Sequence, residues 1–502
     1  MPERDGLSIH VGNPIPADSP GGAAGSGRND PIFTPITFTN LTVKNRIFRS
    51  SISGRIDNYN GSGTPARVRF EEKFAAGGVG AIISSHVPIR IDSRVLPNYA
   101  TIDRDERIPF WRVVGERVHS YDCKFILQLS MSGRQQDIGG IENEPAREKG
   151  IGPLSSTSKC DLFHGLPCKA MTRPEIERAV KDFGDGAERV VSAGLDGIEL
   201  HSSNGYLFNQ FLSSAINDRK DDHGGDLINR ARFLKEVIGE IRSRVGAGVF
   251  LSVKLSVRED DNASLPWPLC NWFSKGNTID ESIQIAKWAE EWGANAIHVS
   301  AGSSFPHPRN PAGPFPMDIA WKIYQSIIAS GKRPTYLGLF QRTFLNYIAM
   351  RYSFLHWIVT RCTWGRTQDF LQGNGEADPE KVEGINIPEA SIIARNVSIP
   401  VICTGGFQTA KGILRALDAG CGAVSIARPL LANSGLPNLL RSGASGPAEP
   451  CSYCNKCLLN VIEHPLGCYD ERRFKKYGAD SYAKMMEEVM SIFPDYKGDR
   501  WL

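Results

Sequence analysis

Long apolar segments and runs of like charge are both missing from this 502-residue sequence. The most apolar window, residues 344–360, is interrupted by Asn346, Arg351 and His356, and it is shorter than the roughly 20 residues that a membrane span needs. We therefore expect a buried or interfacial helix there and no transmembrane segment. The net charge is only +3, from 58 basic and 55 acidic residues, which gives no basic surface of the kind that binds nucleic acid.

A secretion signal and a regular disulfide pattern are missing as well. Residues 1–30 lack the basic start and apolar centre of a signal peptide and are rich in Pro, Gly, Ser and Ala, so we expect a disordered arm on a cytoplasmic protein. The eleven cysteines are an odd number in a chain without such a signal. This favours reduced thiols or metal ligands over a disulfide framework.

The sequence does contain a repeat of short β-rich apolar runs that alternate with longer amphipathic segments. Eight alternations within about 400 residues predict an α/β protein of the (β/α)8 TIM-barrel class, whose binding face is built from the loops after the strands. An open doubly wound sheet is the alternative, but no G-x-G-x-x-G turn follows the first run, where a dinucleotide-binding sheet would carry it. The runs are residues 46–52, 80–89, 124–130, 197–201, 249–257, 296–302, 400–406 and 423–429.

Two stretches interrupt or follow the repeat and set the expected domain limits. After the sixth run, a Pro- and Gly-rich segment opens a long insertion, at about residues 303–386. The repeat ends near residue 445, so we expect residues 31–445 to form the barrel. Residues 446–502 then form a C-terminal extension that carries four cysteines.

The stretch HSSNGYLFNQFLSSAINDRKDDHGGDLINRARF, residues 201–233, closely resembles the signature of the old yellow enzyme family of FMN-dependent oxidoreductases. The resemblance extends from PIFTPITFTNLTVKNRI, through LQLSMSGRQ, to PVICTGGFQTAKGILRALDAGCGAVSIARPLLAN, and covers most of residues 31–433. It implies a barrel that binds FMN and takes NADH or NADPH as its co-substrate.

His201, Asn204 and Tyr206 are the expected catalytic residues. His201 and Asn204 can both donate hydrogen bonds, and two donors at one oxygen would stabilise the charge that develops when a hydride adds next to a carbonyl or nitro group. Tyr206 stays protonated at neutral pH and can supply the proton that the α-carbon needs. The plainer interpretation is that His201 caps a strand, Asn204 makes a turn and Tyr206 packs in the core.

The resemblance also implies which residues hold the flavin. Gln128 matches the glutamine that hydrogen-bonds the flavin pyrimidine, although a barrel-lining polar residue satisfied internally is the alternative. Lys254 stands where the family has a basic residue near flavin N1 and O2, and a cation there would favour the anionic reduced flavin. Ser50, Ser51 and Ile52 match the edge of the first strand that lies against the flavin ring. Ser53 stands in the place of the residue that contacts flavin O4.

The expected phosphate site lies at the ends of the last two strands. Gly405 and Gly406 would let backbone N–H groups approach the phosphate, and Arg428, which follows Ala427, would pair with it. A pair of glycines is common in turns and is a weak signal alone. This prediction therefore depends on the position of the pair at the end of the seventh of the eight predicted strands.

The tail places Cys451, Cys454 and Cys457 at two-residue gaps, with Cys468 after a longer gap. Such spacing suits a tetrathiolate site for a [4Fe-4S] cluster or zinc, and it resembles the cluster loop of 2,4-dienoyl-CoA reductases and trimethylamine dehydrogenase. A thiol cluster without metal is the alternative. Because the sequence ends at Leu502, we do not expect the FAD and nucleotide domains of those larger relatives.

These observations predict an NAD(P)H-driven, ping-pong reductase of activated alkenes, acting on a small molecule. An iron–sulfur reductase or dehydrogenase is the first alternative. A catalytically silent flavin-binding scaffold, docking through residues 344–360, is the second. A homo-oligomer is compatible with all three.

Overall fold

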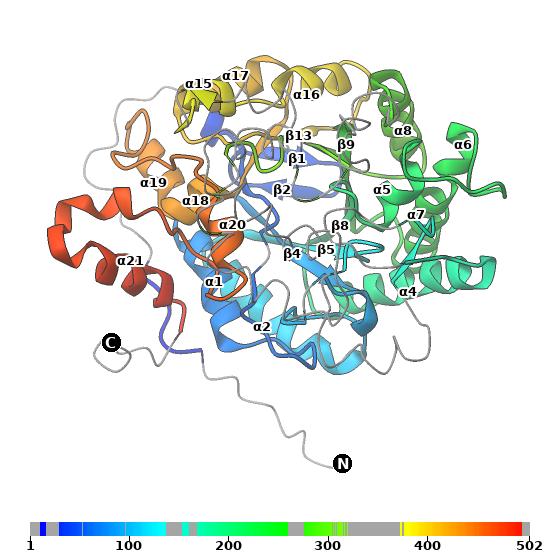
Figure 1. Cartoon of the computed structure of the whole chain (residues 1–502), viewed down its shortest axis with the longest axis horizontal. Coiled ribbons are helices and arrows are strands. Elements are labelled where there is room, and N and C mark those ends of the chain that lie inside the picture. The colour runs from blue at the N-terminus through cyan, green and yellow to red at the C-terminus, as the bar shows by residue number, and fades with distance from the viewer. Residues whose placement is uncertain are drawn as a thin grey trace, which may run out of the picture.

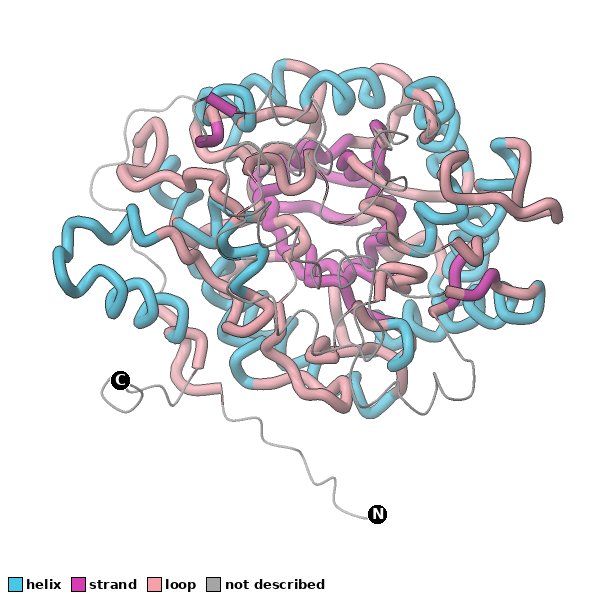
Figure 2. The backbone as a smooth tube through the Cα atoms, in the orientation of Figure 1, coloured by secondary structure: helices cyan, strands magenta, loops and turns pink. Residues whose placement is uncertain are grey.

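The computed structural model has eight parallel strands that close into a barrel, with helices on its outside (Figures 1 and 2). The closed barrel and its covering helices confirm the predicted (β/α)8 class. The expected helix at residues 344–360 lies outside the described residues. The structure describes residues 11–16, 30–52, 54–95, 97–136, 153–159, 168–259, 276–303, 305, 307, 309–314, 316, 319, 372–373 and 376–493.

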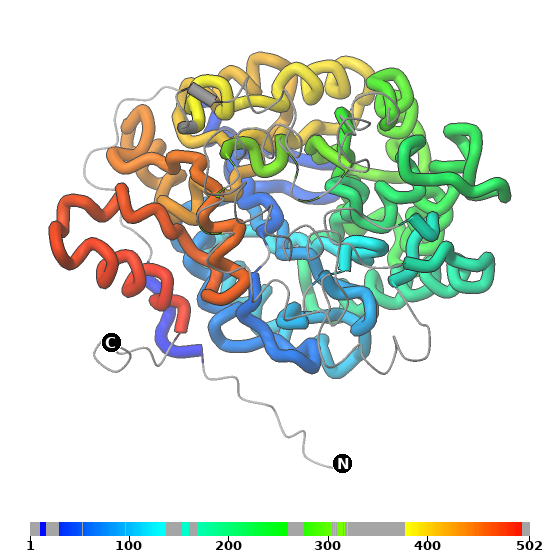
Figure 3. Tube along the Cα trace, in the orientation of Figure 1, coloured from blue at the N-terminus to red at the C-terminus, as the bar shows by residue number. Residues whose placement is uncertain are grey.

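Each of the eight predicted apolar runs corresponds to one barrel strand, and the fourth and fifth of these strands extend one residue beyond their runs. The strands pair in sequence order and the last pairs with the first, so the colours of Figure 3 follow one another around the ring. The barrel strands are β3 (Ile47–Arg49), β4 (Ala81–Pro88), β5 (Lys124–Ser130), β8 (Gly197–Ser202), β9 (Phe250–Arg258), β10 (Ala296–Ala301), β13 (Val401–Thr404) and β14 (Ala423–Ile426). Short strands outside the barrel are β1 (Ile36–Phe38), β2 (Leu41–Val43), β6 (Leu154–Ser155), β7 (Lys169–Ala170), β11 (Gln372–Gly373) and β12 (Glu376–Ala377).

The helices begin and end at sequence signals that satisfy their terminal backbone groups. Thr278 begins one helix with a capping box to Glu281, and Gly246, at φ 73°, ends another. The described α-helices are α1 (Pro65–Ala76), α2 (Ile108–His119), α4 (Arg173–Ser192), α5 (Leu207–Leu212), α6 (Leu227–Arg230), α7 (Arg232–Val245), α8 (Ile279–Glu291), α15 (Pro379–Val382), α16 (Ile387–Ala394), α17 (Ala410–Asp418), α18 (Arg428–Ala432), α19 (Leu436–Arg441), α20 (Lys456–Asn460) and α21 (Ser481–Met490). Short 3-10 helices are η1 (Pro31–Phe33), η2 (Ile91–Ser93), η3 (Asp105–Arg107) and η6 (Glu471–Asp480).

The amino-terminal end of the barrel is closed by apolar side chains of the β1–β2 hairpin. The Phe38 ring lies edge-on to Phe48 of β3, at 5.9 Å, and to Phe250 of β9, at 5.0 Å. All three rings are buried. Because this end is plugged, a ligand can enter only at the carboxyl ends of the strands.

Parts of both termini pack on the barrel. Residues 11–16, inside the predicted arm, contact α1 and the turn after α2: the Ile15 N–H donates to the buried carboxylate of Glu72, and Tyr121 donates to the Ile15 carbonyl at 2.5 Å. In the extension, Arg473 of η6 donates to the Ala432 carbonyl of α18. None of the helices in the described ranges is long and apolar enough to cross a membrane.

Candidate active site

The motif that begins at His201 lies at the open end of the barrel, where β8 ends and α5 begins. The turn between them requires left-handed backbone at Asn204, at φ 61°, and at Gly205, at φ 76°. Asparagine and glycine adopt this conformation at low cost. A Cβ atom on Gly205 would overlap the Ser303 carbonyl oxygen, so only glycine fits there. Tyr206 follows this turn and directly precedes α5.

Three aromatic side chains meet at this end of the barrel. The rings of His201 and Tyr206 are 4.6 Å apart, and His86 of β4 lies 4.9 Å from Tyr206 and 6.0 Å from His201. The structure therefore brings His201 and Tyr206 together. His86 was not predicted, because a single histidine in an apolar run carries no motif.

Burial keeps all three side chains uncharged. It lowers the pKa of His86 to about 3 and, together with the positive charge of Lys254, holds the pKa of His201 well below its usual value. Burial also raises the pKa of Tyr206, so that its phenol stays protonated. His201 Nδ1 lies 3.3 Å from the Ser203 hydroxyl, while neither His201 Nε2 nor the Tyr206 hydroxyl bonds to another described residue. Both groups can therefore donate to a bound molecule.

Asn204 is held at the turn by three hydrogen bonds, and its predicted role as a second donor stays a prediction. Its side-chain amide donates to the Ala301 carbonyl at 3.1 Å and to the Ser300 hydroxyl at 3.3 Å, and its backbone N–H donates to the Ser256 hydroxyl. These bonds tie the turn to β9 and β10. The Ser203 hydroxyl donates to Asn204 Oδ1 at 2.8 Å and lies 3.3 Å from His201 Nδ1, so it links the two side chains.

Below the three rings, the barrel interior holds a layer of polar side chains from six strands. Five of them are fully buried, and Thr404, at the end of β13, is partly buried. Hydrogen bonds connect these side chains across the barrel, which is the arrangement that buried polar groups require. The layer consists of Gln128, Glu199, Ser252, His298, Thr404 and Ser425.

Glu199 is the centre of this layer and was not predicted. Its carboxylate accepts from Gln128 Nε2 at 2.7 Å and from the Ser252 hydroxyl at 3.1 Å, and it lies 2.8 Å from His298 Nδ1. Burial would raise the pKa of Glu199, but the charges and hydrogen bonds of His298, Lys254 and Gln128 outweigh it and lower the pKa. Glu199 is therefore ionised at neutral pH.

Lys254 lies one layer above, beside His201 on the neighbouring strand. Its ammonium is buried and makes no hydrogen bond or ion pair within the described part of the chain. Burial lowers the pKa of Lys254, whereas the nearby charge of Glu199 raises it. A buried cation without a bonded partner fits an anionic group bound at the mouth of the barrel.

The predicted flavin edge of the first strand is adjacent to Gln128. The Ser51 hydroxyl donates to Gln128 Oε1 at 2.8 Å, so the glutamine amide is bonded on one side to Ser51 and on the other to Glu199. Ser50 donates its backbone N–H to the Ile426 carbonyl, and Ile52 is buried. Ser53 lies outside the described residues.

The predicted phosphate residues lie together after β13 and β14. Gly405 and Gly406 follow β13 directly, and Gly406 has a φ of 71°. Ala427 and Arg428 follow β14 and begin α18. The Arg428 guanidinium donates to the Ala312 carbonyl at 2.6 Å and to Asn455 Oδ1 at 2.5 Å. Its five donors leave capacity for a phosphate in addition to these bonds.

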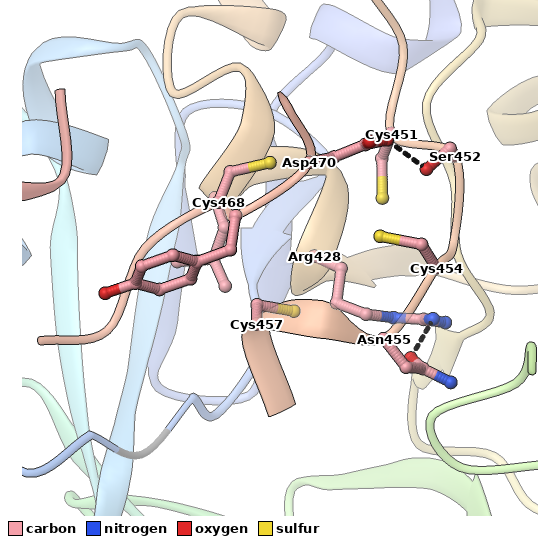
Figure 4. Close-up of a pocket in the computed structure, with 10 residues that line it drawn as sticks. Arg428, Cys451, Ser452, Cys454, Asn455, Cys457, Cys468 and Asp470 are labelled. Carbon is pink, nitrogen blue, oxygen red and sulfur yellow. Dashed lines mark hydrogen bonds between the residues drawn. The ribbon is translucent and has the colours of Figure 1, made fainter. Parts of the chain in front are cut away.

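The four tail cysteines line one small cavity, which Arg428 also lines (Figure 4). Burial raises the pKa of Cys451 to about 12 and also raises the pKa values of Cys457 and Cys468, so these thiols are protonated without a bound cation. In the described ranges, three potential ligand atoms lie within 4.8 Å of one another only at residues 221–223. No three of the four sulfurs therefore lie within 4.8 Å of one another.

One family model and several known proteins are similar to this chain. The model of the NADH:flavin oxidoreductase / NADH oxidase family matches residues 31–319. The chain is 32% identical to NADH oxidase of Thermoanaerobacter brockii over 298 residues, 58% of this chain and 42% of that protein. It is 26% identical to cinnamate reductase of Clostridium sporogenes over 442 residues, 86% of this chain and 56% of that protein. The chain thus spans about half the length of each of these two relatives.

Among solved structures, the fold is similar to that of the old yellow enzyme homologue from Zymomonas mobilis. The TM-score is 0.56 at 20% sequence identity, and the match covers 84% of this chain and 96% of the other. At this identity the likeness supports the barrel fold.

Proposed function

The chain belongs to the NADH:flavin oxidoreductase / NADH oxidase family, and from this premise we propose that it is an FMN-dependent oxidoreductase that uses NADH or NADPH to reduce an activated alkene. The observation that carries the proposal is the neutral pair of His201 and Tyr206, each with a donor that no described residue accepts, beside the buried cation Lys254. A donor, a proton source and a cation at the open end of one barrel are what this reduction requires.

In this proposal the residues that would hold FMN belong to or follow five strands of the barrel. Ser51, Gln128 and Lys254 face its ring, and Gly406 and Arg428 face its phosphate. When bound there, FMN would supply the hydride-transfer chemistry of the reaction. The unpaired ammonium of Lys254 is the feature of the described structure that best fits such an anionic ligand.

The chain's own side chains then act on the substrate. His201 donates a hydrogen bond from Nε2 to the carbonyl oxygen and stabilises the negative charge that develops there. Tyr206, kept protonated by burial, donates its proton to the α-carbon. Asn204 holds the turn between them through its bonds to Ala301 and Ser300. The neutral state of both donors makes this step independent of pH near neutrality.

The similarity to cinnamate reductase supports an α,β-unsaturated acid or a related carbonyl compound as the substrate class. We also propose the domain limits given by the repeat: an arm at 1–30, the barrel at 31–445 with its insertion, and the extension at 446–502. The activity of the whole protein is part of the same proposal, since the relatives are longer than the matched region.

A second candidate function is that of an iron–sulfur flavoprotein, and the four-cysteine cavity favours it. A zinc ion bonded to sulfur at about 2.3 Å would draw four thiolates to within about 4 Å of one another. No three of the sulfurs described here lie within 4.8 Å of one another. A [4Fe-4S] cluster lies between its four thiolates and occupies more space, so the cavity fits an iron–sulfur cluster better than zinc.

The visible spectrum of the purified protein, recorded before and after anaerobic NADPH, tests these functions. A flavin absorbance that bleaches supports the reductase, and a broad additional shoulder with matching iron content supports the cluster. Protein that binds FMN but is bleached by neither NADPH nor NADH would instead be a catalytically silent scaffold. Protein that binds no flavin would overturn the proposal.

A further inference from the structure

Tyr453, between the first two cysteines of the tail, contacts the predicted phosphate site of the barrel. Its hydroxyl donates to the Gly406 carbonyl at 2.5 Å. The guanidinium of Arg428 lies over its ring, 5.3 Å from the ring centre. Tyr453 is fully buried. One side chain therefore contacts both halves of the phosphate site while its backbone belongs to the cysteine loop.

The residues next to Tyr453 extend this connection. The Cys451 N–H donates to Gln408 Oε1 at 2.9 Å, and Gln408 Nε2 donates back to the Cys451 carbonyl at 3.3 Å. Asn455 accepts from Arg428 and donates to the carbonyls of Pro311 and Pro314. The cysteine loop is thus bonded to the loops after β13 and β14 and to the connection after β10.

The backbone of the loop is strained where these bonds form. Tyr453 has a φ of 56° and Asn455 a φ of 57°, so left-handed residues flank Cys454 on both sides. Asparagine tolerates this region, but a bulky tyrosine is an outlier there. Strain of this kind persists only where the surroundings determine the conformation, and it is found mainly at functional sites.

We propose that Tyr453 is a positioning residue that couples the two cofactor sites, so that a metal centre on the four cysteines strengthens FMN binding and FMN strengthens metal retention. The inference rests on the proposed flavin and metal sites. A metal that fixes the cysteine loop also fixes the Tyr453 ring and hydroxyl, and these hold Gly406 and Arg428 in place. By thermodynamic reciprocity, each ligand must change the other's affinity by the same factor.

The test measures the FMN dissociation constant, from the fluorescence of released flavin, before and after anaerobic chelation of the metal. We expect chelation to weaken FMN binding by about tenfold in the wild-type protein, within the usual range of coupling between sites. In Tyr453→Phe, which removes one hydroxyl, we expect FMN to bind about fivefold more weakly with metal present. Chelation should then cause less than about a twofold further change.

Tyr121→Phe is the matched control. Tyr121 also donates to a backbone carbonyl, that of Ile15, but it lies between α2 and β5, at the opposite end of the barrel. This variant should show the same effect of chelation as the wild type. The reciprocal readout is the rate of metal loss to chelator, which should rise when FMN is removed from the wild type and not from Tyr453→Phe.

An FMN dissociation constant that does not change on chelation overturns the inference, and so does an equal change in the wild type and Tyr453→Phe. Protein that holds FMN but neither iron nor zinc overturns it as well, while leaving the proposed flavin chemistry intact. Protein that holds no FMN at all would overturn the proposed function itself, so the two failures can be told apart.

Discussion

At the scale of single residues, Tyr206 is the side chain with the most specific proposed role. Tyr206→Phe should leave reduction of the protein by NAD(P)H unchanged and slow the reaction with alkenes by about 10²-fold, because only that half-reaction needs a proton on carbon. Stopped-flow absorbance separates the two half-reactions. Nitro acceptors, whose reduced product is a stable anion, serve as the internal control. Equal losses for alkene and nitro acceptors would exclude the proton-donor role.

His86 gives a second prediction at this scale, on stability. Its folded pKa, about 3, lies below the unfolded value of about 6.5. As the pH falls below about 6.5 the unfolded chain therefore gains a proton that the folded protein does not, and stability is lost. Between pH 7 and 5 this costs about 2 kcal/mol. Between pH 7 and 5, the free energy of unfolding of His86→Gln should therefore fall by about 2 kcal/mol less than that of the wild type.

Denaturant unfolding at both pH values measures this difference. The matched control is His464→Gln, at an exposed histidine of the tail. An unchanged pH dependence in His86→Gln would mean that the ring of His86 takes up its proton in the folded protein.

At the scale of elements, the turn between β8 and α5 determines where the candidate catalytic residues lie. Gly205→Ala should lower the free energy of unfolding by more than the ~1–2 kcal/mol that a left-handed alanine costs, because the new Cβ also overlaps the Ser303 carbonyl. Gly225→Ala is a close control, since Gly225 has a similar φ of 78° but open space around it. Similar losses in the two variants, measured by denaturant unfolding, would show that the turn can shift to accept a side chain.

The strands of the barrel were predictable because alternation of apolar runs and amphipathic segments depends only on local sequence. Their ends were less so. The eighth run was predicted to extend to Pro429, but the strand ends at Ile426 and Arg428 begins α18, with Pro429 in its first turn. A proline just inside a helix start is favoured, so this boundary was readable in the sequence.

The polar layer could not be predicted in the same way. Glu199 and His298 are single polar residues in apolar strands, and whether they meet depends on the register across β8, β9 and β10. The available signal was the alternation of polar residues on these strands, with Glu199 and His201 on one and Ser252 and Lys254 on the next. This alternation indicates which side chains face the interior of the barrel, but it does not indicate which of them form hydrogen bonds with one another. The donor role of Asn204 likewise stays a prediction, because its partners come from β10.

At the scale of the whole molecule, Arg428 lies where the barrel, the connection after β10 and the extension meet. From α18 it reaches the Ala312 carbonyl and Asn455, and it would also pair with the FMN phosphate. Arg428→Ala should therefore weaken FMN binding by about 10- to 100-fold, the usual value of charge-assisted bonds. It should also speed the loss of metal to a chelator, because the cysteine loop loses a bond.

Arg415→Ala is the control for this variant, since Arg415 also donates to a backbone carbonyl, that of Glu383, but has no bond to the extension or to Gly406 among the described residues. Flavin fluorescence after dialysis and the rate of metal release measure the two effects separately. Wild-type FMN retention in Arg428→Ala would place the phosphate elsewhere. Weakened FMN binding with wild-type metal release would instead limit Arg428 to the flavin. Because Arg428 joins the barrel to the extension, we expect both properties to change together.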